Sequence, residues 1–196
     1  MEADIKELLW FQLNGSFNLL SELAQKTTDA EWTSRAFPHA NLVGFTVWHG
    51  ARTIDWTVNC VLRGGDEVAY AEEWSDISSE AAMFGAGASR ESADGVAMRI
   101  PRLRVLEYIT ALREPVMAWM SGLSPADLAG TVDLKTAHAR RPSYQSPPVW
   151  DEVADLDGIP RWQFLARPAV SHIRVHYGEV TSQLEAIRAA APAERK

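Results

Sequence analysis

The amino-acid sequence predicts an all-α fold: a four-helix bundle of the up-down-down-up type, with two long connections that carry short extra helices. Two observations support this prediction. Apolar residues recur at steps of three and four along four separate segments, which is the period of an α-helix with one buried face. Strand-like patterning is confined to a short stretch at 131–134. The 196 residues suffice for one domain with a sizeable core, so we expect 1–196 to form a single domain.

The first two helices are defined by their apolar faces and by a stop signal. We expect the first over about 3–26, where these residues share one face: Ile5, Leu9, Leu13, Phe17, Leu20 and Leu23. We expect the second over about 42–63, because Arg63 followed by two glycines is typical of a helix C-terminus.

The last two helices each contain a proline. The third is expected over about 102–123, with a kink at Pro115. The fourth is expected over about 167–190, with Pro168 in its first turn, where proline is tolerated. Its apolar seam has the spacing that packs against neighbouring helices: Val170, Ile173, Tyr177, Val180, Leu184 and Ile187.

The long connections, 64–101 and 124–166, hold most of the glycine and proline outside the helices. Connections of this length are usually functional or contain short helices. Thr28–Glu31 has the form of a capping box, and Ser124–Asp127 is a similar helix-start signal. We therefore expect short helices to begin after the first and third long helices.

Composition excludes several classes of protein. The net charge is −7, and the only short basic cluster is Arg140–Arg141, so we expect no nucleic-acid partner. No stretch approaches the roughly 18 uninterrupted apolar residues of a membrane span, and the acidic N-terminus lacks the features of a signal peptide. With a single cysteine there is no intrachain disulfide. We expect a cytoplasmic protein without a membrane partner.

Three histidines form the strongest candidate site. His172 and His176 stand four residues apart on the fourth helix, which places both imidazoles on one face, one turn apart. His49 lies in the apolar second helix. Three imidazoles from two helices suit a divalent ion such as zinc or nickel, and they leave at least one coordination position for water or substrate. Two surface histidines and one core histidine are the alternative interpretation.

Motifs in these two helices resemble a known superfamily. The last helix contains the pattern H-x-x-x-H-Y-G-E over 172–179, and the second contains V-W-H-G-A-R over 47–52. Both resemble histidine motifs of the DinB/YfiT-like superfamily of metal-binding helical bundles. The connectors 29–32 and 123–128 are similar to its inter-helix segments, and 84–89 fits a variant with an extended second connection. The resemblance covers most of the chain and implies a single DinB-like domain.

The resemblance also implies an activity. Similar proteins include thiol-dependent S-transferases and mycothiol-dependent isomerases, in which the metal is thought to activate a low-molecular-weight thiol as thiolate. It therefore implies a transferase with a small-molecule substrate and a thiol such as mycothiol, bacillithiol or glutathione. Water in the thiol's position would make a metal-dependent hydrolase. A non-catalytic, metal- or small-molecule-binding stress-response bundle is a further alternative. Homodimers are common among similar bundles, although the sequence shows no separate interface stripe.

Helical spacing selects the neighbours of the metal ligands. Arg52 and Trp56 lie three and seven residues beyond His49, on its face, and are candidate cofactor-binding residues. Arg52 would pair with a carboxylate of the thiol or substrate; a salt bridge is its alternative role. Core packing is the alternative for Trp56. Glu179, three residues after His176, and Arg52 are the candidate catalytic residues. For Glu179, orienting a ligand histidine is the role that we favour.

Other polar residues are given structural or surface roles. Asp55 points away from the His49 face and is expected to make a structural hydrogen bond or ion pair. His138 is expected to be an exposed loop histidine, with a fourth metal ligand as the alternative. His39 has no partner that the sequence identifies, and Cys60 is expected to be a buried, inert thiol.

Overall fold

The computed structural model describes residues 5–191, and every regular element within that range is helical. This confirms the all-α prediction. The short strand expected at 131–134 is wrong: Thr131 makes only an isolated bridge with Pro160, and helix α7 (Leu134–His138) begins directly after it. The side chain of Asp133 accepts a hydrogen bond from the Thr136 N–H, so it caps a helix where a strand was expected.

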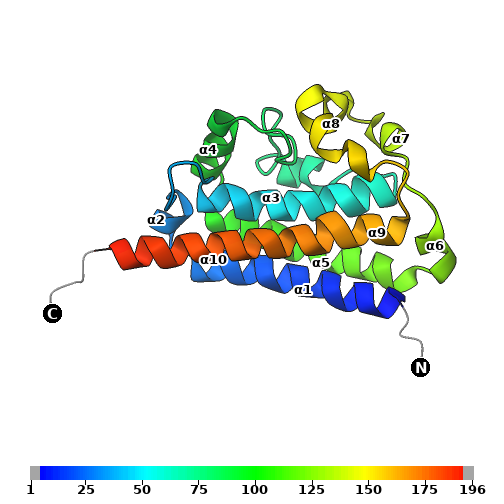
Figure 1. Cartoon of the computed structure of the whole chain (residues 1–196), viewed down its shortest axis with the longest axis horizontal. Coiled ribbons are helices and arrows are strands. Elements are labelled where there is room, and N and C mark those ends of the chain that lie inside the picture. Colours follow the sequence, from blue (N-terminus) through cyan, green and yellow to red (C-terminus); the bar gives the residue numbers. More distant parts are fainter. Residues whose placement is uncertain (1–4, 192–196) are drawn as a thin grey trace.

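The long helices lie alongside one another (Figure 1): α1 (Ile5–Lys26), α3 (Val43–Asp55), α5 (Arg102–Gly122) and α10 (His172–Ala190). Helix α1 packs against α5 and α10, and α3 packs against α5 and α10. The predicted face of α1 is buried from Leu9 to Leu23, whereas Ile5 at its first turn is exposed. The predicted seam of the last helix also faces the core, with Tyr177 and Ile187 half-buried at its edge.

Two of the long helical runs contain π-helical segments. Helix α3 continues into η1 (Trp56–Leu62), so the predicted end of the second helix is confirmed. The start of the fourth helix was placed wrongly at 167. The run begins at α9 (Arg161–Ala166) and passes through η6 (Arg167–Ser171) before α10. Pro168 lies in this wider segment, which tolerates a residue without an N–H inside a helical run.

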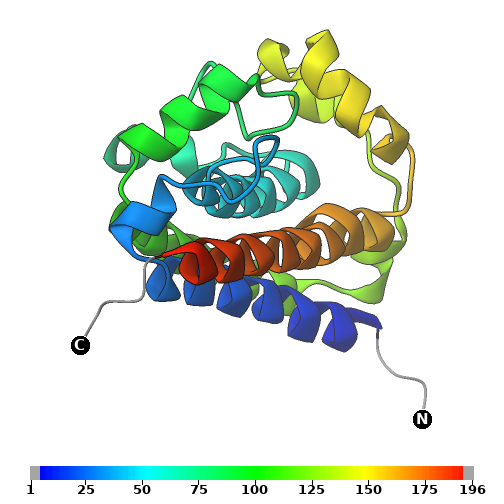
Figure 2. The ribbon, with the colours of Figure 1, turned by 60° about the vertical axis from the view of Figure 1, so that its left-hand side comes forward.

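The long connections carry short helices, as predicted. The first contains η2 (Val68–Tyr70), η3 (Glu72–Trp74) and α4 (Arg90–Arg99). The second contains α6 (Pro125–Ala129), α7, η4 (Pro142–Gln145), α8 (Pro147–Val153), η5 (Ala154–Leu156) and α9. Figures 1 and 2 show α4 and α8 on the side of α3 that faces away from α1. These parts of the two connections therefore cover the same side of α3.

The expected capping boxes are present. The Thr28 side chain accepts from the Glu31 N–H while the Glu31 carboxylate accepts from the Thr28 N–H, at the start of α2 (Asp29–Trp32). Ser124 and Asp127 make the same reciprocal pair at the start of α6. Within residues 5–191, no helix combines the length and apolar character needed to cross a membrane.

Candidate metal centre

The structure brings the three predicted histidines together. His49 lies in the middle of α3, His172 is the first residue of α10, and His176 follows one turn later. The His172 Nε2 atom lies 3.0 Å from the Nε2 of His49 and 3.0 Å from the Nε2 of His176. All three candidate ligand atoms lie within 4.8 Å of one another. Three imidazole nitrogens therefore converge on one point, as a divalent ion requires.

The protein holds the other ring nitrogen of two of these histidines. His49 Nδ1 donates to the carbonyl oxygen of Phe84 at 2.7 Å, and His176 Nδ1 donates to the Glu179 carboxylate at 2.9 Å. A proton held on Nδ1 leaves the Nε2 lone pair free to bind an ion. The donor set therefore fits a metal site. Glu179 takes the supporting role favoured from the sequence.

The surroundings keep two of the imidazoles, those of His49 and His172, in the neutral form. Burial, together with the neighbouring His176 and His172 rings, holds the pKa of His49 well below its usual range. Burial and the His176 ring lower the pKa of His172 to about 4. The hydrogen bond from His176 lowers the pKa of the Glu179 carboxyl and keeps it ionised. Neutral imidazole is the form that binds metal, so the site is prepared for an ion at neutral pH.

A tight loop in the first connection supports His49. The Phe84 carbonyl reaches the imidazole because Gly85, with a φ of 111°, turns the chain at that point. A Cβ atom built on Gly85 would lie 2.0 Å from His49 Nδ1, so no larger residue fits without movement. Met83, with a φ of 52°, is also in the left-handed region. The sequence analysis missed this contact, because the acceptor is a backbone oxygen; the closely spaced glycines of 84–89 were its only signal.

A pocket of about 310 Å³ opens beside the histidines. His49 and His172 are among its lining residues, and α8, η5 and η6 contribute others. Trp56 is among the lining residues, so the structure places this candidate at the pocket as well as in the core. An ion held by the histidines would therefore face a space that can receive a small molecule.

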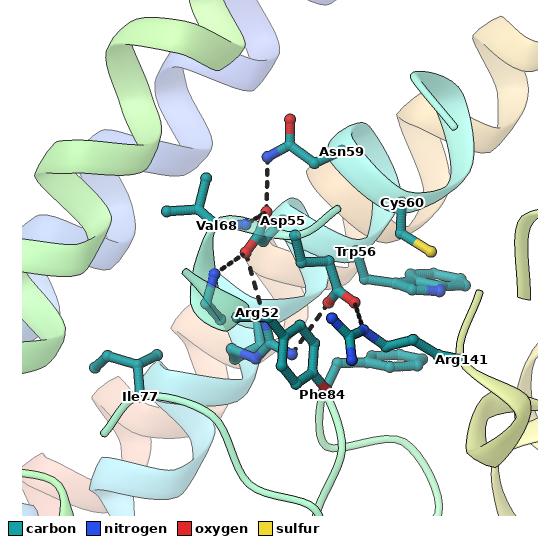
Figure 3. A network of polar contacts seen from close by, with 12 residues as sticks. Arg52, Asp55, Trp56, Asn59, Cys60, Val68, Ile77, Phe84 and Arg141 are labelled. Atoms are coloured by element: carbon teal, nitrogen blue, oxygen red, sulfur yellow. Dashed lines mark hydrogen bonds and ion pairs between the residues drawn. The ribbon is translucent and has the colours of Figure 1, made fainter. Parts of the chain in front are cut away.

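Arg52 does not line this pocket. Its fully buried guanidinium lies 3.1 Å from Glu67 and 3.3 Å from Asp55, both of which are also buried (Figure 3). This corrects the expectation that Arg52 reaches a carboxylate on a thiol or substrate, because its charge is already matched inside the fold. Asp55 has the expected structural role: it also accepts from the backbone N–H groups of Val68 and Ala69.

The remaining candidates divide between core and surface. His138 is fully buried and is not one of the three clustered histidines; its Nε2 accepts from the Trp56 indole N–H at 3.1 Å. The exposed-loop interpretation of His138 was therefore wrong, because the second connection packs against η1. His39 is exposed. Burial raises the pKa of the Cys60 thiol to about 12, as expected of an inert cysteine.

Comparison with known proteins adds no relative: no protein-family model matches the chain, and no curated protein matches it either. The site is therefore interpreted from its own geometry. Three imidazole nitrogens from two packed helices define a candidate three-histidine metal centre. Phe84 and Glu179 hold the outer nitrogens of His49 and His176, and a pocket lies alongside.

Proposed function

We propose that this protein is a metal-dependent enzyme built on a DinB/YfiT-like four-helix bundle. In its reaction, the sulfur of a low-molecular-weight thiol, such as mycothiol, bacillithiol or glutathione, forms a bond to an electrophilic carbon of a small molecule. The displaced group leaves with the electron pair of the broken bond, and the thiol proton is released. The observation that carries the proposal is the convergence of three imidazole Nε2 atoms beside a pocket. A structural zinc site is normally closed by four protein ligands, whereas three ligands beside a pocket are typical of catalysis.

The residues of this chain have distinct roles in the proposal. His49, His172 and His176 would hold a zinc or nickel ion. Phe84 and Glu179 would fix the ring orientations of two of these ligands. The ion, when bound, would supply the positive charge that favours a thiolate nucleophile at neutral pH. The pocket would hold the electrophile next to that nucleophile.

A metal-dependent hydrolase is the second candidate. It is favoured by the position of Arg52, the cation expected to receive a thiol's carboxylate, which is paired with buried acids instead. In a hydrolase, water would take the place of the thiol. A non-catalytic binding protein has no need for an open coordination position beside a pocket.

Metal analysis of purified variants tests the site. We expect His176→Ala to bind far less zinc or nickel than the parent, because one of three ligands is lost. His39→Ala is the matched control, since His39 is exposed and outside the cluster, and it should bind as the parent does. Equal metal content in His176→Ala and the parent would overturn the site.

Cobalt substitution tests the thiol. Cobalt-loaded protein should gain a sulfur-to-metal charge-transfer band in the near ultraviolet when mycothiol, bacillithiol or glutathione is added. The band should be absent from cobalt-treated His176→Ala protein. If the cobalt d–d bands are present but none of the three thiols adds the new band, the transferase proposal fails and the hydrolase remains.

A further inference from the structure

The pocket beside the histidines has an apolar interior and a charged mouth. Apart from His49 and Thr53, its buried lining residues are all apolar or aromatic: Trp56, Phe84, Ala86, Val153, Leu156 and Pro168. The exposed lining residues are mostly polar or charged: Glu152, Asp155, Arg167, Ser171 and Val175. A group that enters the pocket toward the metal ligands therefore passes from charged to apolar surroundings.

One wall of the interior consists of two stacked aromatic side chains, Trp56 and Phe84. The rings of Trp56 and Phe84 stack with centroids 4.5 Å apart and an angle of 6° between their planes. The hydrogen bond from the Trp56 indole to His138 fixes the tryptophan in this orientation. Phe84 is fixed in turn by its carbonyl contact with His49. Phe84 therefore contributes both to this wall of the pocket and to the position of His49.

Another part of the interior lining comes from the second connection, through Val153 and Leu156. It fits closely on the first connection: a Cβ atom built on Gly87 would lie 2.2 Å from the carbonyl oxygen of Pro148 in α8. At the mouth, Arg167 and Asp155 form an ion pair with 2.7 Å between nitrogen and oxygen. Both side chains are exposed, so the charges of this pair lie at the mouth and not in the apolar interior.

We propose that the pocket binds an uncharged aromatic or similarly apolar group, carried by the molecule that coordinates the metal. The metal-binding end would bind the ion that the three histidines would hold, and the apolar group would lie between the Trp56–Phe84 wall and Leu156. The proposal rests on the metal centre of the proposed function, and it applies equally to a thiol transferase and to a hydrolase. It identifies the substrate class as small molecules with an apolar body.

The test compares two probes that share a metal-binding group. Acetohydroxamate and benzohydroxamate both chelate divalent ions, and they differ by a methyl against a phenyl group. On cobalt-loaded protein, titration of the d–d bands gives a dissociation constant for each. We expect benzohydroxamate to bind at least about tenfold more tightly, because only its phenyl group removes a large apolar area from water. Both probes bind the same cobalt ion through the same chelating group. A change in the environment of that ion therefore affects both dissociation constants and leaves their ratio unchanged.

Two variants locate the phenyl group. Ser171→Phe places a bulky ring at an exposed lining position, and should reduce the ratio to about one. Ser182→Phe, exposed on α10 but outside the pocket, is the matched control and should keep the parent ratio. Leu156→Ala removes part of the apolar lining and should lower the ratio about threefold or more. This variant adds no side chain, so its effect does not depend on where a new ring points, as the effect of Ser171→Phe does.

The outcomes distinguish a failure of the apolar-pocket proposal from a failure of the proposed transferase function. A parent ratio near one, or a high ratio that survives both Ser171→Phe and Leu156→Ala, would overturn the apolar pocket. Tight benzohydroxamate binding with no thiol charge-transfer band would uphold the pocket and overturn the transferase. Failure of the parent to bind cobalt would overturn the metal centre and the pocket proposal with it.

Discussion

At the scale of single residues, the metal centre depends on a backbone carbonyl that only glycine can place. Gly85 combines a φ of 111° with a Cβ direction that points at His49 Nδ1. We expect Gly85→Ala to weaken metal binding by about tenfold or more, the usual effect of disturbing the partner of a ligand histidine. The dissociation constant, measured by competition with a chelating dye, checks this.

Gly64→Ala is the control for backbone strain. Gly64 also has a positive φ, of 63°, but a Cβ atom there would meet no other atom within 4 Å. Both substitutions therefore cost conformational energy, and only Gly85→Ala disturbs His49. If the two variants bind metal equally, the Phe84 carbonyl does not position the ligand.

His138 should make the metal-free protein less stable in mild acid. Burial lowers its pKa to about 4, so between the ordinary histidine value and that pKa the unfolded chain binds more protons than the folded one. Stability therefore falls as the pH drops from about 7 to about 5, and His138 alone contributes about 2 kcal/mol to that loss.

Denaturant unfolding at the two pH values, with chelator present, isolates this contribution. His138→Gln keeps an acceptor for the Trp56 N–H and does not titrate, so its stability should fall by about 2 kcal/mol less than that of the parent. His49 and His172 also have lowered pKa values but are present in both proteins. Equal losses in parent and variant would contradict the prediction.

The candidate site was predictable from sequence only in part. The four-residue spacing of His172 and His176 fixes their shared face, and the third histidine lies on a neighbouring helix, so the cluster could be found. Arg52 shares the helical face of His49 by spacing, but its direction depends on Glu67, a partner in the folded connection. His138 was misjudged for the same reason: its burial depends on long-range packing of a segment without helical periodicity.

At the scale of elements, helix ends with local signals were predicted well. Gly64 follows the end of one helical run, and Pro101 precedes the start of α5. Both positions follow from the backbone preferences of glycine and proline, and the structure agrees with the prediction. The start of the last helix was misplaced because a proline in a first turn and a proline in a π segment have the same local sequence. Only the preceding turn, Arg161–Ala166, distinguishes them. Helix α2 illustrates the reverse case, in which four residues of sequence contain the whole signal.

The capping box of α2 gives a stability prediction that leaves the metal site unchanged. Thr28→Ala removes the side chain that accepts from the Glu31 N–H, and should cost about 1 kcal/mol of unfolding free energy. Ser182→Ala, at an exposed position in α10, should change stability by less than about 0.5 kcal/mol. Denaturant unfolding measures both. Metal affinity should match the parent in each, and a Thr28→Ala protein as stable as Ser182→Ala would contradict the role of the cap.

At the scale of the whole molecule, metal binding and ligand binding come from different parts of the chain. The long helices α3 and α10 supply the three ligand nitrogens. The two connections, parts of which cover the same side of α3 in Figures 1 and 2, supply Phe84 and much of the pocket wall. A connection can therefore change in sequence and alter ligand preference while the histidines stay in place.

The same division predicts what the metal contributes to folding. The core runs through the long helices and is buried without any ion, so metal-free protein should be helical and should unfold cooperatively. A ligand that binds only the folded state at about one hundred times its dissociation constant adds about 2.7 kcal/mol. At about 2–4 °C per kcal/mol for a chain of this length, zinc or nickel should raise the melting temperature by roughly 5–10 °C.

Circular dichroism melts with chelator and with excess metal measure this shift, and His176→Ala should show none of it. The parent and the variant should melt at similar temperatures in chelator, because His176 is half-buried at the edge of the helical core. An unfolded chelated parent would make the site structural, since the ion would then create the fold instead of adding to it. An unchanged melting temperature in excess metal would mean that the three Nε2 atoms do not hold an ion.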